Sequence, residues 1–151
     1  MAVFIISAGV VGVIKVVPSI ISGGSVNESR LAAAYLAQEG IEIARNIRDS
    51  NLLEGDSWDE QLNTPECNAG CELDYTNASQ QDPLLSAYSA RFLRADASGF
   101  HQYSSGNQTK YQRKITILKA GDVITITAEV FWQDKGSAYN FPVQEKLYNW
   151  Y

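Results

Sequence analysis

The residues whose type and spacing most directly predict chemistry are Cys67 and Cys71, the two cysteines of the chain. They lie in a stretch rich in Asn, Pro and Gly, which is typical of a loop. In an exported domain, such a pair is expected to form a disulfide that closes a short ring. Two free thiols are the alternative. A redox site is disfavoured, because the spacing is CxxxC rather than CxxC and no helix is expected to start after the pair.

Catalytic and metal-binding residues are sparse. His101 is the only histidine, so neither a histidine metal cluster nor a Ser-His-Asp triad can be assembled. Asp56, Asp59 and Glu60 could provide oxygen ligands for calcium, but they lack the regular spacing of a known loop, and a solvated acidic face is the alternative. The sequence therefore predicts no enzyme, catalytic residue, metal site or cofactor.

Three Asn-x-Ser/Thr sequons begin at Asn27, Asn77 and Asn107. Each is an acceptor for N-linked glycans in a secreted protein. Chance occurrence is the alternative interpretation, because the motif is short. We expect glycosylation at these positions only if the chain is exported.

The composition indicates one small exported domain. The chain has 151 residues, of which 45% are hydrophobic and 19% are charged, and its net charge is −5. Its Lys and Arg residues are spread along the chain and form no basic patch, which disfavours nucleic acid as a primary partner.

The first 21 residues form an apolar stretch with Lys15 as their only charge. As a helix they would be roughly 30 Å long, the thickness of the hydrocarbon core of a bilayer. Residues 1–24 are therefore predicted to be an apolar helix that crosses a membrane. Pro18, Gly23 and Gly24 predict a helix break at its end, because proline lacks a backbone donor and glycine disfavours the helical state.

A second, amphipathic helix is predicted over residues 25–51. Ser25 and Glu28 have the spacing of a capping box at its start. Leu36, Ile43 and Ile47 recur at helical spacing, which predicts an apolar stripe that packs on a sheet.

The remaining two regions differ in pattern. Residues 52–96 are broken by Gly, Pro, Asn and Ser, and are predicted to be a loop region that carries the disulfide, although residues 84–93 could carry a short strand or a helical turn. Residues 97–151 alternate apolar and polar side chains, which predicts an antiparallel sheet with strands at 99–103, 111–118, 123–132 and 139–147. Pro142 favours an edge position for the last strand. Residues 25–151 would thus form one globular domain.

The N-terminal run AVFIISAGVVGVIKVVP and the helix AAAYLAQEGIEIARNIRDSN resemble the type IV pilin and pseudopilin superfamily. The resemblance covers the N-terminal helix in detail and the remainder only in architecture. It implies an α+β, pilin-like fold in which a long N-terminal helix, apolar and then amphipathic, packs on a C-terminal antiparallel β-sheet. Family members usually carry a glutamate near the start of this helix. Here the first acidic residue is Glu28, so we expect that Met1 lies inside the family segment.

The resemblance implies a structural subunit of a type IV pilus-like extracellular filament. Such a subunit lies in the inner membrane before assembly, contacts the pilus assembly machinery, and then polymerises with its own copies through the N-terminal helix. A minor pseudopilin of a type II secretion or DNA-uptake system is one alternative, and a membrane-tethered binding domain that never polymerises is another. The predicted filament-core residues are Val3, Phe4, Ile5, Ile6, Val10, Val11, Val13, Ile14, Val16 and Val17.

Overall fold

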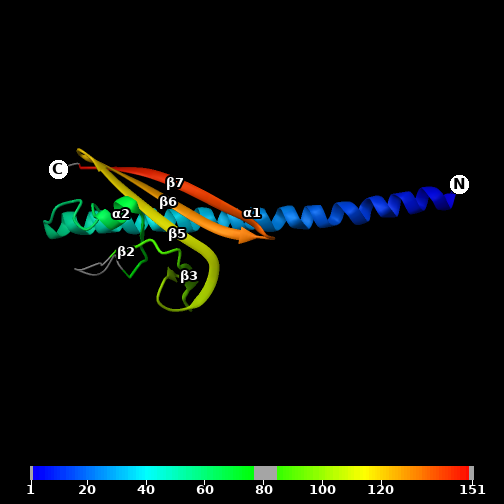
Figure 1. The fold of residues 1–151 in the computed structure, drawn as a ribbon, viewed down its shortest axis with the longest axis horizontal. Coiled ribbons are helices and arrows are strands. Elements are labelled where there is room, and N and C mark those ends of the chain that lie inside the picture. Colours follow the sequence, from blue (N-terminus) through cyan, green and yellow to red (C-terminus); the bar gives the residue numbers. More distant parts are fainter. Residues whose placement is uncertain (1, 77–84, 150–151) are drawn as a thin grey trace. The chain divides into compact units, whose positions relative to one another are not determined.

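The computed structural model describes the backbone of residues 2–76 and 85–149, and the side chains of residues 25–76 and 85–149. The chain divides into two compact units, which we call the helical unit (Met1–Ala32) and the sheet unit (Ala33–Tyr151). The helices and strands are α1 (Ala2–Glu54), α2 (Pro65–Ala69), β1 (Cys71–Glu72), β2 (Ser86–Ala87), β3 (Phe92–Ala95), β4 (His101–Gln102), β5 (Asn107–Ala120), β6 (Val123–Asp134) and β7 (Ser137–Tyr148) (Figure 1).

All the strand pairs of the sheet are antiparallel. The long strand β5 lies at its centre and pairs with β6 on one side and with β1 and β3 on the other. In the described part of the chain, β7 pairs only with β6, so it is an edge strand that carries Pro142. An edge position suits proline, because proline has no backbone N–H to donate to a neighbouring strand.

Two tight turns connect the three long strands. Gly121 follows β5 with a φ of 60°, and Lys135 and Gly136 follow β6 with φ values of 50° and 80°. Short hairpin turns favour positive φ because their backbone twist then matches that of the strands. These turns fix the register of β5, β6 and β7, which keeps one set of alternating side chains on the buried face.

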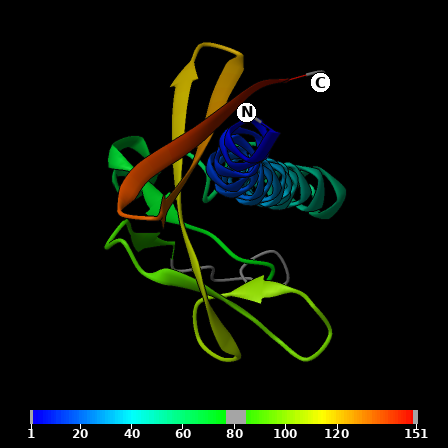
Figure 2. The ribbon, with the colours of Figure 1, turned by 90° about the vertical axis from the view of Figure 1, so that its right-hand side faces the viewer.

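The core lies between this buried face and the part of α1 that belongs to the sheet unit (Figure 2). The helix contributes small and branched side chains, and the strands contribute isoleucine and valine. Gly40 allows close packing, because a Cβ added there would lie 2.7 Å from Cδ1 of Ile115. The main core residues are Ala33, Leu36, Ala37, Ile43, Ala44, Ile47, Ile115, Ile117, Ile124, Ile126, Ala128 and Val130.

The predicted fold class, a long helix packed on a C-terminal sheet in a pilin-like arrangement, is wrong. The structure is mainly a seven-stranded antiparallel sheet, and the unit that contains it takes α1 only from Ala33 onward. The sheet is also not confined to residues 97–151, because β1, β2 and β3 come from the segment expected to be a loop. Strands of two to four residues show no periodicity that a sequence pattern can reveal, and here β1 and β3 pair with β5 while β2 pairs with β1.

No helix break is present at Pro18, Gly23 and Gly24 in the single chain, and a break in the assembled filament stays a prediction. Helix α1 runs from Ala2 to Glu54 without interruption. Proline removes one backbone donor and kinks a helix, but the turns on either side can continue. The predicted new start at Ser25 is absent as well, and Ser29 instead donates a hydrogen bond from Oγ to the carbonyl oxygen of Ser25 at 2.8 Å.

Candidate interaction sites

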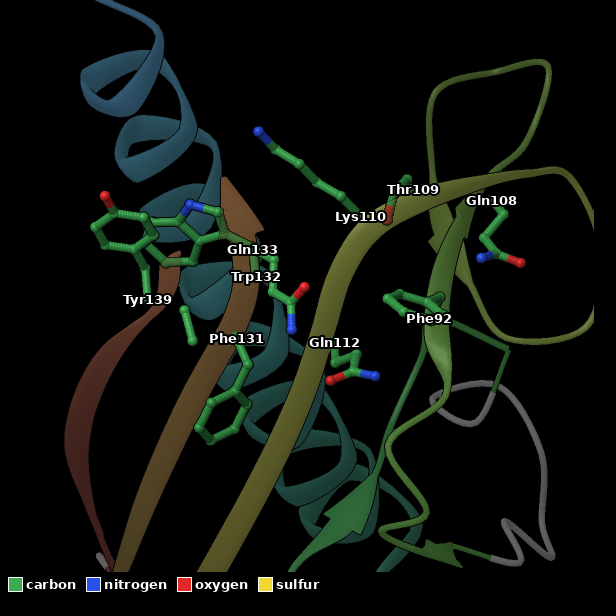
Figure 3. A pocket seen from close by; sticks show the side chains of 10 residues that line it. Phe92, Gln108, Thr109, Lys110, Gln112, Phe131, Trp132, Gln133 and Tyr139 are labelled. Atoms are coloured by element: carbon green, nitrogen blue, oxygen red, sulfur yellow. The ribbon is translucent and has the colours of Figure 1, made fainter. Parts of the chain in front are cut away.

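A groove of about 650 Å³ lies in the sheet unit where β5 and β6 diverge. The two strands pair from Gln112 opposite Phe131 to Ala120 opposite Val123. Before Gln112, β5 pairs with β3, and the β3–β5 register shifts between Phe92 and Arg94. Such an irregularity bends a strand and increases its twist. We call the resulting space the divergence groove (Figure 3).

Aromatic and amide side chains form most of the walls of the divergence groove. The rings of Trp132 and Tyr139 stack with centroids 5.5 Å apart and an interplanar angle of 17°. Tyr111 lies 6.1 Å from Trp132 behind them. The lining residues are Phe92, Gln108, Thr109, Lys110, Gln112, Phe131, Trp132, Gln133, Ala138 and Tyr139.

The indole N–H of Trp132 is buried and has no hydrogen-bond acceptor among the described residues. The whole side chain is only 3% exposed. A buried donor without an acceptor costs about 1–3 kcal/mol, so such groups are rare in folded proteins. The Trp132 side chain, which lines the groove, therefore carries a buried donor that no described residue satisfies.

The charges at the divergence groove are paired. Lys110 is its only charged lining residue, and its Nζ lies 3.4 Å from Oδ2 of Asp134 and 5.7 Å from the ring centre of Tyr111. Gln112 donates from Nε2 to the carbonyl oxygen of Ala90 at 2.6 Å. The side-chain amides of Gln108 and Gln133 have no hydrogen-bond partner within residues 25–76 and 85–149.

A second polar cluster lies inside the core around Arg113, which is fully buried. Its guanidinium donates to the carbonyl oxygens of Leu36 at 2.9 Å and Leu73 at 2.7 Å, and to Oε1 of Glu39 at 3.2 Å. Glu39 also contacts Nδ1 of His101 at 3.1 Å. This network connects α1, β5, β4 and the end of β1, so it fixes how the helix lies on the sheet.

Two pKa shifts follow from this network. Burial acts to raise the pKa of Glu39, but the hydrogen bond with His101 and the charge of Arg113 outweigh it, so the pKa is lowered. Burial raises the pKa of Tyr103 to about 12, although the charge of Arg113 opposes the shift. The Tyr103 hydroxyl donates to the carbonyl oxygen of Arg113 at 3.1 Å. Glu39 is therefore held as a carboxylate and Tyr103 as a neutral phenol.

Cys67 and Cys71 form a disulfide, as predicted, and both are fully buried. Cys67 lies in α2, which Thr64 caps by accepting a hydrogen bond from the Cys67 N–H at 3.3 Å. Cys71 begins β1 and lies opposite Ile115 of β5. The disulfide thus attaches the short helix to the centre of the sheet rather than closing an isolated loop.

The other residues selected from the sequence are not brought together into a site. Asp59 accepts a hydrogen bond from Lys119 at 2.6 Å and another from Ser57 at 2.7 Å, while Asp56 and Glu60 are exposed. In the described part of the chain, no group of three or more His, Cys, Asp or Glu side chains is placed to hold a metal ion.

Two of the three sequon asparagines can be placed. Asn27 is exposed on α1 and Asn107 is exposed at the start of β5. Asn77 lies outside the described residues. Glycosylation at these positions stays a prediction.

The predicted filament-core residues, from Val3 to Val17, lie in the part of α1 whose side chains are outside the described residues. Their role stays a prediction. Among the residues that the structure describes, no helix is both long enough and apolar enough to span a bilayer.

No family model, curated protein or solved structure matches this chain. The function must therefore be argued from the residues and their geometry.

Sequence reasoning missed the divergence groove and the buried arginine. The arginine had a signal, because Arg113 falls on the same face of β5 as Ile115 and Ile117 in a strand of period two. An arginine on an apolar face must find acceptors inside the core. The groove had no such signal, since it arises where the pairing between β5 and β6 stops at Gln112 and Phe131.

Proposed function

We propose that this chain is a structural subunit of a type IV pilus-like extracellular filament that polymerises through its N-terminal helix. The observation that supports this is the make-up of the helical unit, which consists of α1 alone. Its first 21 residues carry a single charge, Lys15. An apolar helix needs apolar neighbours on all sides, and a unit of one helix has no second element to provide them.

Two environments would meet this need in succession. Before assembly, the lipid of the inner membrane would surround the apolar segment, and the pilus assembly machinery would act on it there. In the filament, the same segment from neighbouring copies would replace the lipid. Ser7, Ala8, Gly9 and Gly12 favour this step, because small residues allow helices to approach closely in an apolar environment.

Mechanical shearing of cells that express the full chain tests the proposal. We expect the protein to leave the cells with the sheared material and to sediment as a high-molecular-weight fraction that contains filaments by electron microscopy. A known integral membrane protein of the same cells is the control and should stay with the cells. If the chain also stays with the cells and no filaments are seen, it is a tethered domain and the proposal is wrong.

A minor pseudopilin would give a third pattern in the same experiment. The chain would then appear in sheared filaments only in small amounts relative to another subunit. Quantitative mass spectrometry of the filament fraction distinguishes this result from a filament made mainly of this chain.

A further inference from the structure

We propose that the divergence groove binds an uncharged oligosaccharide. The described lining residues of the groove all belong to the sheet unit and come from β3, β5, β6 and β7. The inference goes beyond the proposed filament and does not depend on it, because the groove exists in the single chain. Its volume of about 650 Å³ is in the range of small-ligand sites.

The aromatic walls suit the apolar faces of sugar rings. Phe92 on β3 is 42% exposed, and Phe131 on β6 and Tyr139 on β7 are partly exposed (Figure 3). Each sugar ring has a face of C–H groups. Packing this face on an aromatic ring removes both surfaces from water, which favours binding. The stack of Tyr139 on Trp132 holds one of these surfaces in place.

The polar groups of the groove suit hydroxyl groups. Gln108 and Gln133 each offer a donor and an acceptor that no described residue uses. The indole N–H of Trp132 lacks an acceptor, and a sugar hydroxyl can accept its hydrogen bond. Because this nitrogen is buried, the ligand reaches it only if the ring shifts, so its environment reports on occupancy.

The charge balance selects against ionic ligands. Lys110 is paired with Asp134, so the groove offers no free charge to an anionic or cationic group. A charged ligand would lose hydration without gaining an ion pair. The ligand expected from the lining is therefore neutral and rich in hydroxyl groups.

An extended peptide is the competing ligand, because β5 and β6 each have one edge without a strand partner in the groove. However, the two strands diverge beyond the pair of Gln112 and Phe131, that is, before Gln112 in β5 and after Phe131 in β6. A peptide strand needs a partner at a constant spacing of about 4.8 Å, so it could follow only one of the two edges. It would leave the glutamine amides and the aromatic walls largely unused.

The test is a titration of the full chain, labelled with ¹⁵N, in zwitterionic micelles without a sugar headgroup. The probes are maltotriose, cellotriose, mannotriose and the N-acetylglucosamine trimer, with trigalacturonate and an uncharged Thr-Val pentapeptide as comparison ligands. The readout is the indole ¹H–¹⁵N signal of Trp132, assigned with the Trp132→Phe variant. We expect at least one neutral trisaccharide to move this signal in a saturable way.

Variants locate the binding. Phe92→Ala and Gln133→Ala should each weaken the affinity roughly tenfold, the expected loss for one ring contact or one hydrogen bond. Phe100→Ala is the matched control, because Phe100 is also exposed but lies outside the groove, and it should leave the affinity unchanged. Circular dichroism checks that each variant is folded.

Three outcomes would overturn the proposal. The first is that no neutral trisaccharide moves the Trp132 indole signal, even at concentrations of roughly a few millimolar, which would detect a weak ligand. The second is a saccharide response that Phe92→Ala and Gln133→Ala do not weaken. The third is stronger binding of the pentapeptide or of trigalacturonate. The proposed filament would survive each of these results, because shearing tests it separately.

Discussion

The two parts of helix α1 differ in what they need for burial. From Ala33 to Asn51 the helix alternates buried and exposed side chains, and the sheet of the same unit covers its apolar stripe. The segment up to Ile21 is apolar on all sides in sequence and belongs to a unit with no other element. One regular helix can therefore serve two kinds of packing, and the side-chain pattern rather than the backbone decides which one.

The largest expected effect is on the apolar segment up to Ile21. Val11→Asp should abolish filaments, because a carboxylate at the centre of an apolar helix costs about 3 kcal/mol in a membrane-like environment, and the cost recurs in every subunit. Electron microscopy of the sheared fraction measures the effect. Val11→Leu is the matched control and should assemble. If Val11→Asp forms filaments of normal length, the segment up to Ile21 does not pack in an apolar filament core.

The next effect should fall on the sheet unit. Arg113→Met should lower its free energy of unfolding by about 3 kcal/mol, because the carbonyl oxygens of Leu36 and Leu73 lose their donor in the core. Urea unfolding followed by fluorescence gives the value. Arg94→Met is the control, since Arg94 donates only to the exposed carbonyl of Gly106, and its effect should stay below about 1 kcal/mol.

Loss of the disulfide should have a smaller and more local effect. The free energy of unfolding of the Cys67→Ser, Cys71→Ser variant should be lower by about 2 kcal/mol, since a bridge across so short a ring restricts the unfolded chain only moderately. Hydrogen exchange should increase in α2 and β1, while β6 and β7 stay protected. If α2 and β1 exchange at the same rate in the parent chain and in the serine variant, the disulfide does not hold α2 to the sheet.

The smallest effect concerns pH. The pKa of Glu39 is lowered from 4.5 in the folded state, so the unfolded state binds more protons near that pH. The ionised carboxylate therefore stabilises the sheet unit above about pH 4.5, and this contribution is lost as the pH falls through the folded pKa.

Glu39→Gln should remove this part of the acid sensitivity while it keeps a hydrogen-bond acceptor beside Arg113. Unfolding midpoints measured from pH 6 to pH 3 test the effect. Asp56→Asn, at an exposed position outside the network, is the control and should retain the acid sensitivity of the parent chain. The same slope for Glu39→Gln and the parent chain would contradict the prediction.

Local patterns account for the long strands and for the disulfide. The alternation of Ile124, Ile126 and Ala128, and the turn at Gly121, are enough to predict β6 and its partner β5. The Cys67–Cys71 pair was predictable because its neighbours are loop-forming residues, and because the sequence predicted an exported domain, in which cysteine pairs are expected to be oxidised. Each of these features depends on residues close together in the sequence.

Long-range pairing decided the rest. Strands β1 and β3 pair with β5, and β2 pairs with β1, and no periodicity marks segments of two to four residues. The buried network joins Glu39 to Arg113, 74 residues apart. The divergence groove exists because β5 and β6 pair only from Gln112 opposite Phe131 onward, while β5 before Gln112 and β6 after Phe131 separate. These features depend on contacts between distant segments, and those contacts form only when the whole sheet does.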